Sequence, residues 1–420
     1  MPDAGETDAA DEPPALPVDP GDILDTTLRI DLTAHTGIAT LTMTPSEGRE
    51  TLEVGDLMIR SVYVRNEQGS ETALDWTRQG TQLLLTLPAS TVPVQVTFEY
   101  DWQTHERHDG IASSGQVYTW PYWCGNVFPC RPAPAGGSTF HLTLEGNDAP
   151  KLYPSAIAND APAYMLAWNT GWQRQVRLGT TSAGTRVSLW RDGADAEAAA
   201  LGSAHLVAAF DWMEQHLGAY RFGGDVASVV VNRSVLADGG IEHHPYWQVS
   251  SGVAGDESVH VHEAAHGWFG NGVRLRCWED FVLSEGTASY LAARVLEEVA
   301  GSDVSAAVWQ GYWNVQQTPG VLNWIAWPES CGQIDILDEE LHLTSPIPYV
   351  KGALFLRALE QRIGRELFDR GLRTFYQRWA GQAAGMQDLL DVMQEQSGYA
   401  VESCARSWLR QAAAPPEACP

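Results

Sequence analysis

The chain has 420 residues, of which 44% are apolar and 19% charged, as is usual for a globular protein. This length predicts two domains, each large enough to bury a core of its own. The formal net charge of −27 argues against nucleic acid or an anionic membrane surface as a partner. No apolar run is long enough to predict a transmembrane segment.

Residues 1–20 are acidic, rich in Pro and Ala, and without periodicity, which predicts a disordered tail. The segment also looks like the linker that follows a removed export signal or a lipid-anchored cysteine. We therefore expect an exported protein, either periplasmic, secreted or lipid-anchored, with a cytoplasmic protein as the alternative.

Residues 21–192 predict a β domain. Apolar and polar residues alternate in segments 22–43, 83–87, 92–98 and 140–144, and Gly, Pro, Asn and Asp separate these segments. Residues 185–190 have the same strand-like pattern and are assigned to the same domain.

Near residue 193 the periodicity changes, and residues 193–420 predict a second, mostly helical domain. An Ala-rich stretch at 194–217 has helical spacing, and residues 225–232 read as a strand. Further helices are expected at 349–363, 366–379, 387–396 and 402–410.

Two histidines four residues apart are the strongest chemical signal. His262 and His266 would lie one above the other on a helix, about 5–6 Å apart at Cβ, so both rings can reach one metal ion. Glu263 could approach a metal-bound water instead of the metal, and Glu285, after a gap of 18 residues, would be the third ligand. This spacing predicts one Zn²⁺ per chain with its fourth position open to water or substrate.

Residues 262–291 resemble the M1 family of zinc aminopeptidases, whose members carry HExxH, an aromatic-Gly-Asn step and then WND-x-W-x-NEG-x-ASY. Residues 268–271 match the first step, and residues 278–286 match the second. Residues 239–243, GGIEH, resemble the GxMEN motif of the family, and residues 348–353 resemble its P-Y-x-K-G segment.

The resemblance implies an α+β fold, with an N-terminal all-β saddle domain followed by a thermolysin-like, mostly helical metallopeptidase domain. Longer members continue with a helical C-terminal domain, so this short form is expected to have a more open cleft. The implied activity is hydrolysis of the N-terminal peptide bond of peptides that have a free N-terminus.

Particular roles follow for the residues that match the motifs. Glu263 would move the proton of the attacking water, and Tyr349 would donate a hydrogen bond to the oxyanion. Glu242 would bind the substrate ammonium, and the edge strand that carries it would pair with the substrate backbone. That strand contains Gly239, Gly240 and Ile241. Asp280 would support a metal ligand from behind, or would serve only as a helix-start carboxylate.

One departure from the family pattern leaves other functions open, because Trp120 stands where many relatives carry a second amine-binding Glu or Gln. Glu279 and Ser284 also replace the usual asparagines of the motif. The alternatives are a zinc endopeptidase or hydrolase of modified peptides, and a non-catalytic binding protein. The oligomeric state and side-chain preference are not predicted.

The chain has six cysteines, an even number. In an exported protein we expect Cys124 to pair with Cys130 and Cys404 with Cys419, which leaves Cys277 for Cys331. Six buried thiols are the alternative for a cytoplasmic enzyme.

Overall fold

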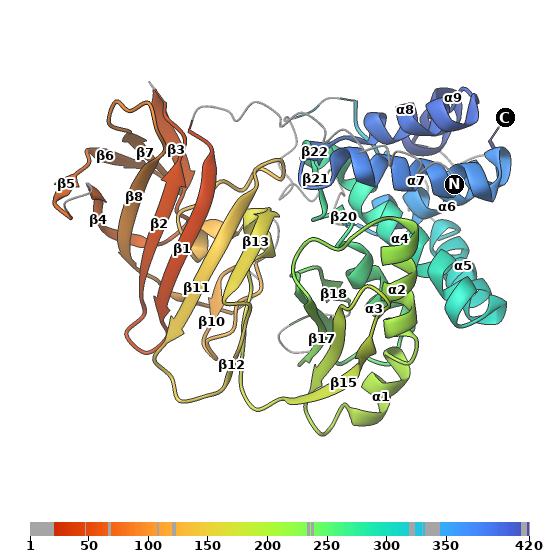
Figure 1. Ribbon diagram of the computed structural model, residues 1–420, viewed down its shortest axis with the longest axis horizontal. Helices are drawn as coiled ribbons and strands as arrows, with labels where there is room; N and C mark the ends of the chain where they lie inside the picture. The colour runs from red at the N-terminus through yellow and green to blue at the C-terminus, as the bar shows by residue number, and fades with distance from the viewer. Residues whose placement is uncertain are drawn as a thin grey trace, which may run out of the picture.

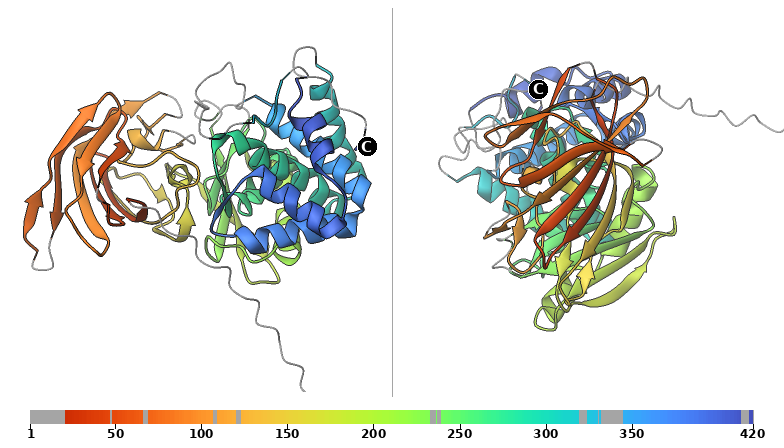
Figure 2. Two further views of the ribbon diagram at one scale, coloured as in Figure 1. Left: turned by 90° about the horizontal axis from the view of Figure 1, so that it is seen from above. Right: turned by 90° about the vertical axis from the view of Figure 1, so that its left-hand side faces the viewer.

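The computed structural model describes residues 21–46, 48–65, 69–106, 109–119, 123–232, 236, 239–318, 324–329, 331, 345–412 and 418–419. A strand-rich half and a half dominated by helices lie side by side (Figure 1, Figure 2). The predicted α+β fold is therefore confirmed. None of the helices among the described residues is both long and apolar enough to cross a membrane.

A seven-stranded sheet of order β13-β11-β1-β2-β8-β4-β5 forms most of the first half. At its centre, β1 (Ile23–Asp31) and β2 (Thr36–Met43) are antiparallel. Alternate residues of β2 are buried, because successive side chains of a strand point to opposite faces. A second sheet of order β3-β7-β6 adds its leucines to the same core.

Within the described residues, the other elements of this half are β3 (Arg49–Glu53), β4 (Met58–Arg65), β5 (Glu71–Ala73), β6 (Trp76–Gln79), β7 (Gln82–Thr86), β8 (Val94–Asp101), β9 (Thr104–His105), β10 (Ile111–Ala112), η1 (Cys124–Asn126), β11 (Ser138–Glu145), β12 (Lys151–Leu152), β13 (Ala156–Ala161), η2 (Ala163–Met165) and β14 (Asn169–Thr170).

The boundary between the halves lies earlier than predicted. β15 (Arg174–Thr180) and β16 (Arg186–Arg191) belong to the five-stranded sheet of the second half, where β16 pairs in parallel with β17 (Asp225–Val231). The assignment of residues up to 192 to the first domain is therefore wrong. An alternating pattern identifies a strand but not the sheet that it joins, and the change of period near residue 193 marks only the end of β16.

This five-stranded sheet of the second half has the order β15-β16-β17-β19-β18. β18 (Gly240–Ile241) lies at its edge, and β19 (Tyr246–Ser250) lies beside β18. Helices α2 (Leu206–His216) and α3 (Glu257–Ala265) share a core with this sheet. The single helix predicted at 194–217 is two, because a turn after α1 (Ala196–Gly202) interrupts it.

Helix α4 (Phe281–Val299) is the central helix of the remaining body, and its residues 281–296 are all buried. Helices α6 to α9 begin and end within two residues of the predictions, whereas α5 was not predicted as a separate element. The remaining elements are β20 (Phe269–Gly270), β21 (Val273–Leu275), η3 (Trp278–Asp280), α5 (Ser302–Gln316), α6 (Ile347–Ile363), α7 (Arg365–Trp379), β22 (Ala383–Ala384), α8 (Met386–Ser397) and α9 (Glu402–Leu409).

One buried arginine joins the two halves. Arg274 on β21 donates to the backbone carbonyls of Ala135 and Asp160 in the first half, at 3.0 and 3.4 Å. It also donates to the Gly381 carbonyl of the second half at 3.1 Å. These bonds fix the strand-rich half against the half that carries the predicted metal ligands.

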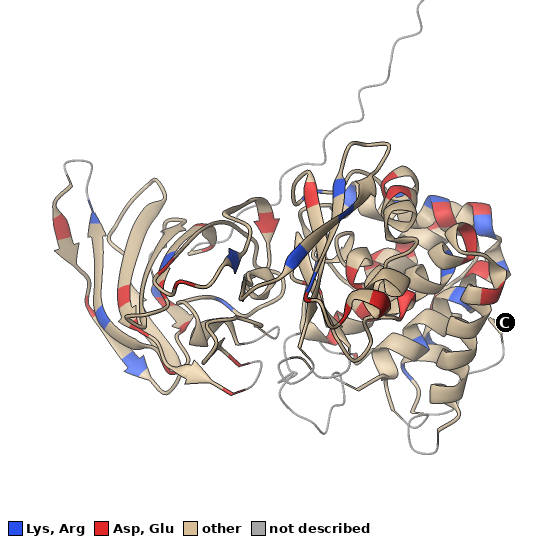
Figure 3. Cartoon of the chain, turned by 90° about the horizontal axis from the view of Figure 1, so that it is seen from below, with Lys and Arg blue, Asp and Glu red and all other residues tan. Residues whose placement is uncertain are grey.

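Three disulfides join the pairs expected from the sequence, Cys124–Cys130, Cys277–Cys331 and Cys404–Cys419. The described part of the chain has no free cysteine. Acidic residues occur in both halves of the chain, with basic residues among them along the ribbon (Figure 3).

Candidate active site

The three predicted metal ligands meet between α3 and α4. His262 Nε2 lies 3.1 Å from Glu285 Oε2 and 3.1 Å from His266 Nε2, and His266 Nε2 lies 3.4 Å from Glu285 Oε2. Two ligand atoms at about 2.0–2.1 Å from a tetrahedral zinc ion would lie about 3.3 Å apart. The spacing of these three atoms therefore fits one zinc ion.

Hydrogen bonds behind the histidines set their tautomers. His266 Nδ1 lies 3.0 Å from the Phe269 carbonyl oxygen, which can only accept, so Nδ1 carries the proton. In the neutral ring, Nε2 then keeps its lone pair for the metal. Ser284 Oγ also lies 3.1 Å from His266 Nδ1, and Ser289 Oγ lies 3.3 Å from His262 Nδ1.

The charge of the cluster also suits a cation. Glu242, Glu263 and Glu285 are nearly buried around His266, whose ring nitrogen lies in one group with oxygens of Glu242 and Glu263. Although burial opposes it, the nearby carboxylates raise the pKa of His266 to about 10. Burial raises the pKa of Glu285, but His266 and His262 outweigh this effect and lower the pKa to about 2. Buried negative charge of this kind needs a cation close by.

Glu263 lies on α3 between the two histidine ligands and is 4% exposed. Burial, together with the charges of Glu242 and Glu285, raises the pKa of this carboxyl group well above its ordinary value, although His266 opposes the shift. Gly240 on the edge strand lies so close to Glu263 that a Cβ there would collide with the carboxylate. A glycine at this position therefore leaves the space that the Glu263 side chain fills.

The edge strand β18 places Glu242 beside Glu263. Oxygens of these two carboxylates and a ring nitrogen of His266 all lie within 4.8 Å of one another. Gly240 begins this edge strand, and Gly239 directly precedes it. Ile241 differs, because its side chain is 7% exposed and packs in a small cluster with Tyr118 and Val229.

Tyr349 lies in the first turn of α6 and faces the metal ligands. Its ring stacks on His262 with a centroid distance of 5.8 Å and an interplanar angle of 19°. The ring of Phe281 meets it edge-on at 6.2 Å. The structure thus brings Tyr349 beside the three ligands, which is the placement that an oxyanion donor would need.

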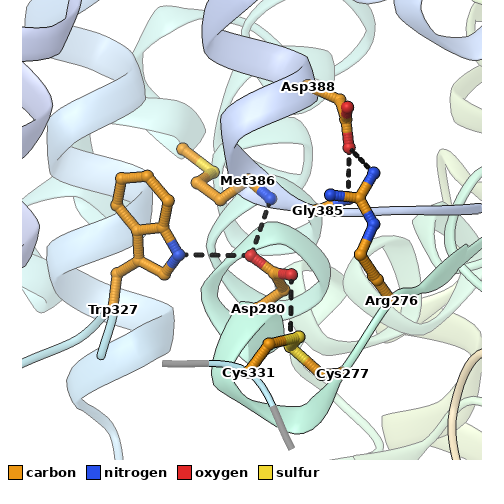
Figure 4. Close-up of a disulfide and its surroundings, with 8 residues drawn as sticks. All are labelled: Arg276, Cys277, Asp280, Trp327, Cys331, Gly385, Met386 and Asp388. Carbon is orange, nitrogen blue, oxygen red and sulfur yellow. Dashed lines mark hydrogen bonds and ion pairs between the residues drawn. A yellow bond between two sulfur atoms is a disulfide. The ribbon is translucent and has the colours of Figure 1, made fainter. Parts of the chain in front are cut away.

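Asp280 does not support a metal ligand in the contacts of the described residues. Its Oδ1 accepts from the Met386 backbone at 2.8 Å and from Trp327 Nε1 at 3.2 Å (Figure 4). The neighbouring Cys277–Cys331 disulfide ties the same corner to residue 331. Asp280 directly precedes α4. Its position therefore agrees better with the alternative prediction, a carboxylate at the start of a helix.

Sequence reasoning assigned no role to three buried residues near this site, Tyr164, His244 and Asn271. His244 Nε2 donates to the Glu263 backbone carbonyl at 2.8 Å, and its Nδ1 accepts from the Tyr220 hydroxyl at 2.8 Å. Asn271 belongs to the aromatic-Gly-Asn step of the motif, and this match is the sequence signal that could have identified it as a site residue. Trp120, where a second amine anchor was sought, lies outside the described residues.

His260, two residues before His262, bonds Ser228 Oγ at 2.8 Å and the Ala254 carbonyl at 2.9 Å. Both of its ring nitrogens therefore have partners outside the ligand cluster.

Residues 244–408 match the model of the Peptidase family M1 domain. Among curated proteins, the chain is 30% identical to aminopeptidase N of Streptomyces lividans over 159 residues, which are 36% of this chain and 18% of that protein. It is 24% identical to leukotriene A-4 hydrolase of Xenopus laevis over 402 residues, 84% of this chain and 64% of that protein. The chain thus spans less than two thirds of either relative.

Solved structures share the fold over nearly the whole chain. The M1 zinc metallopeptidase from Deinococcus radiodurans aligns with a TM-score of 0.78 at 18% identity, covering 96% of each chain. Legionella pneumophila aminopeptidase A aligns with a TM-score of 0.77 at 16% identity, covering 93% of this chain and 49% of that one. The chain thus shares its fold with these two structures. Its residues 244–408 are similar to the Peptidase family M1 domain.

Proposed function

We propose that this protein is a zinc-dependent aminopeptidase that hydrolyses the N-terminal bond of peptides. The observation that carries the proposal is the position of Glu242, whose carboxylate lies at the edge strand in one cluster with Glu263 and His266. A fixed carboxylate there can pair with the ammonium of a substrate and place the first peptide bond over the metal ligands. The names of the family relatives support the same activity.

Each residue of the candidate site has its own role in the proposed hydrolysis. His262, His266 and Glu285 would hold Zn²⁺, which when bound supplies a Lewis acid for the scissile carbonyl and for water. Glu263 takes a proton from the attacking water and later delivers it to the leaving amine. Tyr349 donates its hydroxyl proton in a hydrogen bond to the oxygen that becomes negative. The edge of β18 offers backbone groups to an extended substrate.

A panel of aminoacyl fluorogenic amides beside matched N-acetylated peptides tests the proposal. We expect turnover of the free-amine substrates alone, abolished by a chelator and restored by zinc. Equal cleavage of blocked and free peptides would instead favour the alternative, an endopeptidase or hydrolase of modified peptides. Undetectable zinc after purification without chelator would favour a binding protein.

We also propose that the protein functions in an oxidising compartment outside the cytoplasm. The three disulfides support this proposal, because such bonds persist mainly in exported proteins. A thiol count on denatured, unreduced protein should find no free thiol, whereas six free thiols would contradict it.

A further inference from the structure

Tyr164 brings a hydroxyl group from the first half of the chain to the candidate active site. It lies in η2, directly after β13, and is 5% exposed. Its ring packs against Trp278 at a centroid distance of 6.1 Å. The hydroxyl lies 3.1 Å from Asn271 Oδ1, on the loop that follows the metal-binding helix. Its closest polar partners therefore belong to the other half of the molecule.

The orientation of Asn271 shows the direction of these bonds. Asn271 is fully buried, and its Nδ2 donates to the Glu242 backbone carbonyl at 2.6 Å. Because the amide nitrogen faces Glu242, the amide oxygen faces Tyr164 and accepts from its hydroxyl. Asn271 thus holds the backbone of Glu242, and Tyr164 in turn holds the amide of Asn271.

The hydroxyl remains a proton donor in this environment. Burial, followed by the charges of Glu242 and Glu285, raises the pKa of Tyr164 well above its ordinary value. The proton that Tyr164 donates to the Asn271 amide oxygen keeps the amide nitrogen turned toward the Glu242 carbonyl. This chain of two bonds fixes the backbone from which the Glu242 carboxylate extends.

We propose that Tyr164 is a positioning residue that orients Glu242 to receive the N-terminal ammonium of the substrate. The inference rests on the proposed aminopeptidase function and deepens it. It assigns the strand-rich half a direct part in substrate recognition, through a described residue and independently of Trp120. Loss of the hydroxyl would release the Asn271 amide and loosen the backbone of Glu242, which would weaken binding of the ammonium more than the chemical step.

The Tyr164→Phe variant tests this role because it removes only the hydroxyl. With a leucyl fluorogenic amide, we expect KM to rise roughly threefold to tenfold, the effect of losing one buried hydrogen bond between neutral groups. We expect kcat to change much less and the zinc content to stay at the wild-type value. An unchanged KM in a folded, zinc-loaded variant would overturn the proposal.

The matched control is Tyr100→Phe, which removes another buried hydroxyl, one that donates to the Val127 carbonyl at 2.9 Å within the first half. This variant should lose similar stability but keep the wild-type KM. If both variants raise KM equally, the effect reports stability and the positioning role is wrong.

A double-mutant cycle tests whether Tyr164 acts through Glu242. Tyr164→Phe should raise KM in the wild-type background and have little further effect in a Glu242→Gln background. Additive effects would mean that Tyr164 acts elsewhere, which overturns the proposal. Failure of the aminopeptidase function itself is distinguishable, because the wild-type protein would then cleave acetylated and free peptides equally.

Discussion

The backbone of Gly286 on α4 lies directly against that of Gly352 on α6. A Cβ on Gly286 would come within 2.7 Å of the Gly352 Cα, closer than real Cβ atoms approach other atoms. Gly286 follows the predicted metal ligand Glu285, and Gly352 lies three residues after Tyr349. This contact between two helices therefore sets the distance between a predicted ligand and the predicted oxyanion donor.

Replacing Gly286 with alanine should push the two helices apart. We expect a loss of about 1–3 kcal/mol in the free energy of unfolding from overpacking, together with a lower kcat. Thermal unfolding and steady-state kinetics measure the two effects. Gly311→Ala in α5 is the control, because nothing lies within 4 Å of its Cβ position and alanine favours a helix. Equal stability of both variants would contradict this account of the contact.

Replacing Glu263 with glutamine tests the proposed proton transfer. A side-chain amide cannot accept the proton of water, so we expect turnover of the Glu263→Gln variant to fall by roughly 10²–10⁴-fold while zinc is retained. Glu366→Gln, at an exposed position of α7, should have wild-type activity. Near-normal turnover in the Glu263 variant would show that another group moves the proton.

Ser284 replaces an asparagine of the family motif, yet its hydroxyl lies 3.1 Å from Nδ1 of His266. Gly270 has no side chain where a Cβ would collide with this hydroxyl. Ser284→Ala should therefore weaken zinc affinity by about tenfold without abolishing it, since the Phe269 carbonyl still holds the ring. Titration against a competing chelator measures the change. Ser305→Ala, another buried helical serine, should retain wild-type affinity.

His244 predicts a pH dependence of stability. Burial lowers its pKa to about 3, whereas the ordinary value in an unfolded chain is about 6.5. Between these values the unfolded chain binds a proton that the folded chain does not, so stability falls as the pH is lowered below 6.5. The contribution of one such group approaches about 1.4 kcal/mol per pH unit.

The His244→Gln variant keeps an amide donor for the Glu263 carbonyl but does not titrate. Its free energy of unfolding should therefore fall less steeply than that of the wild-type protein between pH 6 and pH 4. Denaturant unfolding at several pH values gives both slopes, and comparison of the two proteins removes the contribution of groups they share. Identical slopes would mean that His244 is not buried as a neutral ring.

The sequence could predict that the three candidate metal ligands lie together, because their geometry is local. His262 and His266 need only a helix, and Glu285 needs one more helix that packs on it. Tyr164 could not be found in this way, since it lies about 100 residues before its partners and reaches them only when the two halves pack together. The placement of β15 failed for a related reason, because the partners of a strand are set by tertiary packing.

The contacts of Asp280 lead to a final prediction that separates metal support from helix packing. Asp280→Ala would leave the Met386 backbone N–H and the Trp327 indole N–H without their acceptor in a buried corner. Each unmet donor costs about 1–3 kcal/mol, so we expect a clear fall in melting temperature. Asp280→Asn keeps one carbonyl oxygen for these donors and should recover much of the loss. Zinc affinity should stay at the wild-type value in both variants, because Asp280 contacts none of the three ligands among the described interactions. A loss of zinc affinity without loss of stability would restore the role that the motif suggested for Asp280.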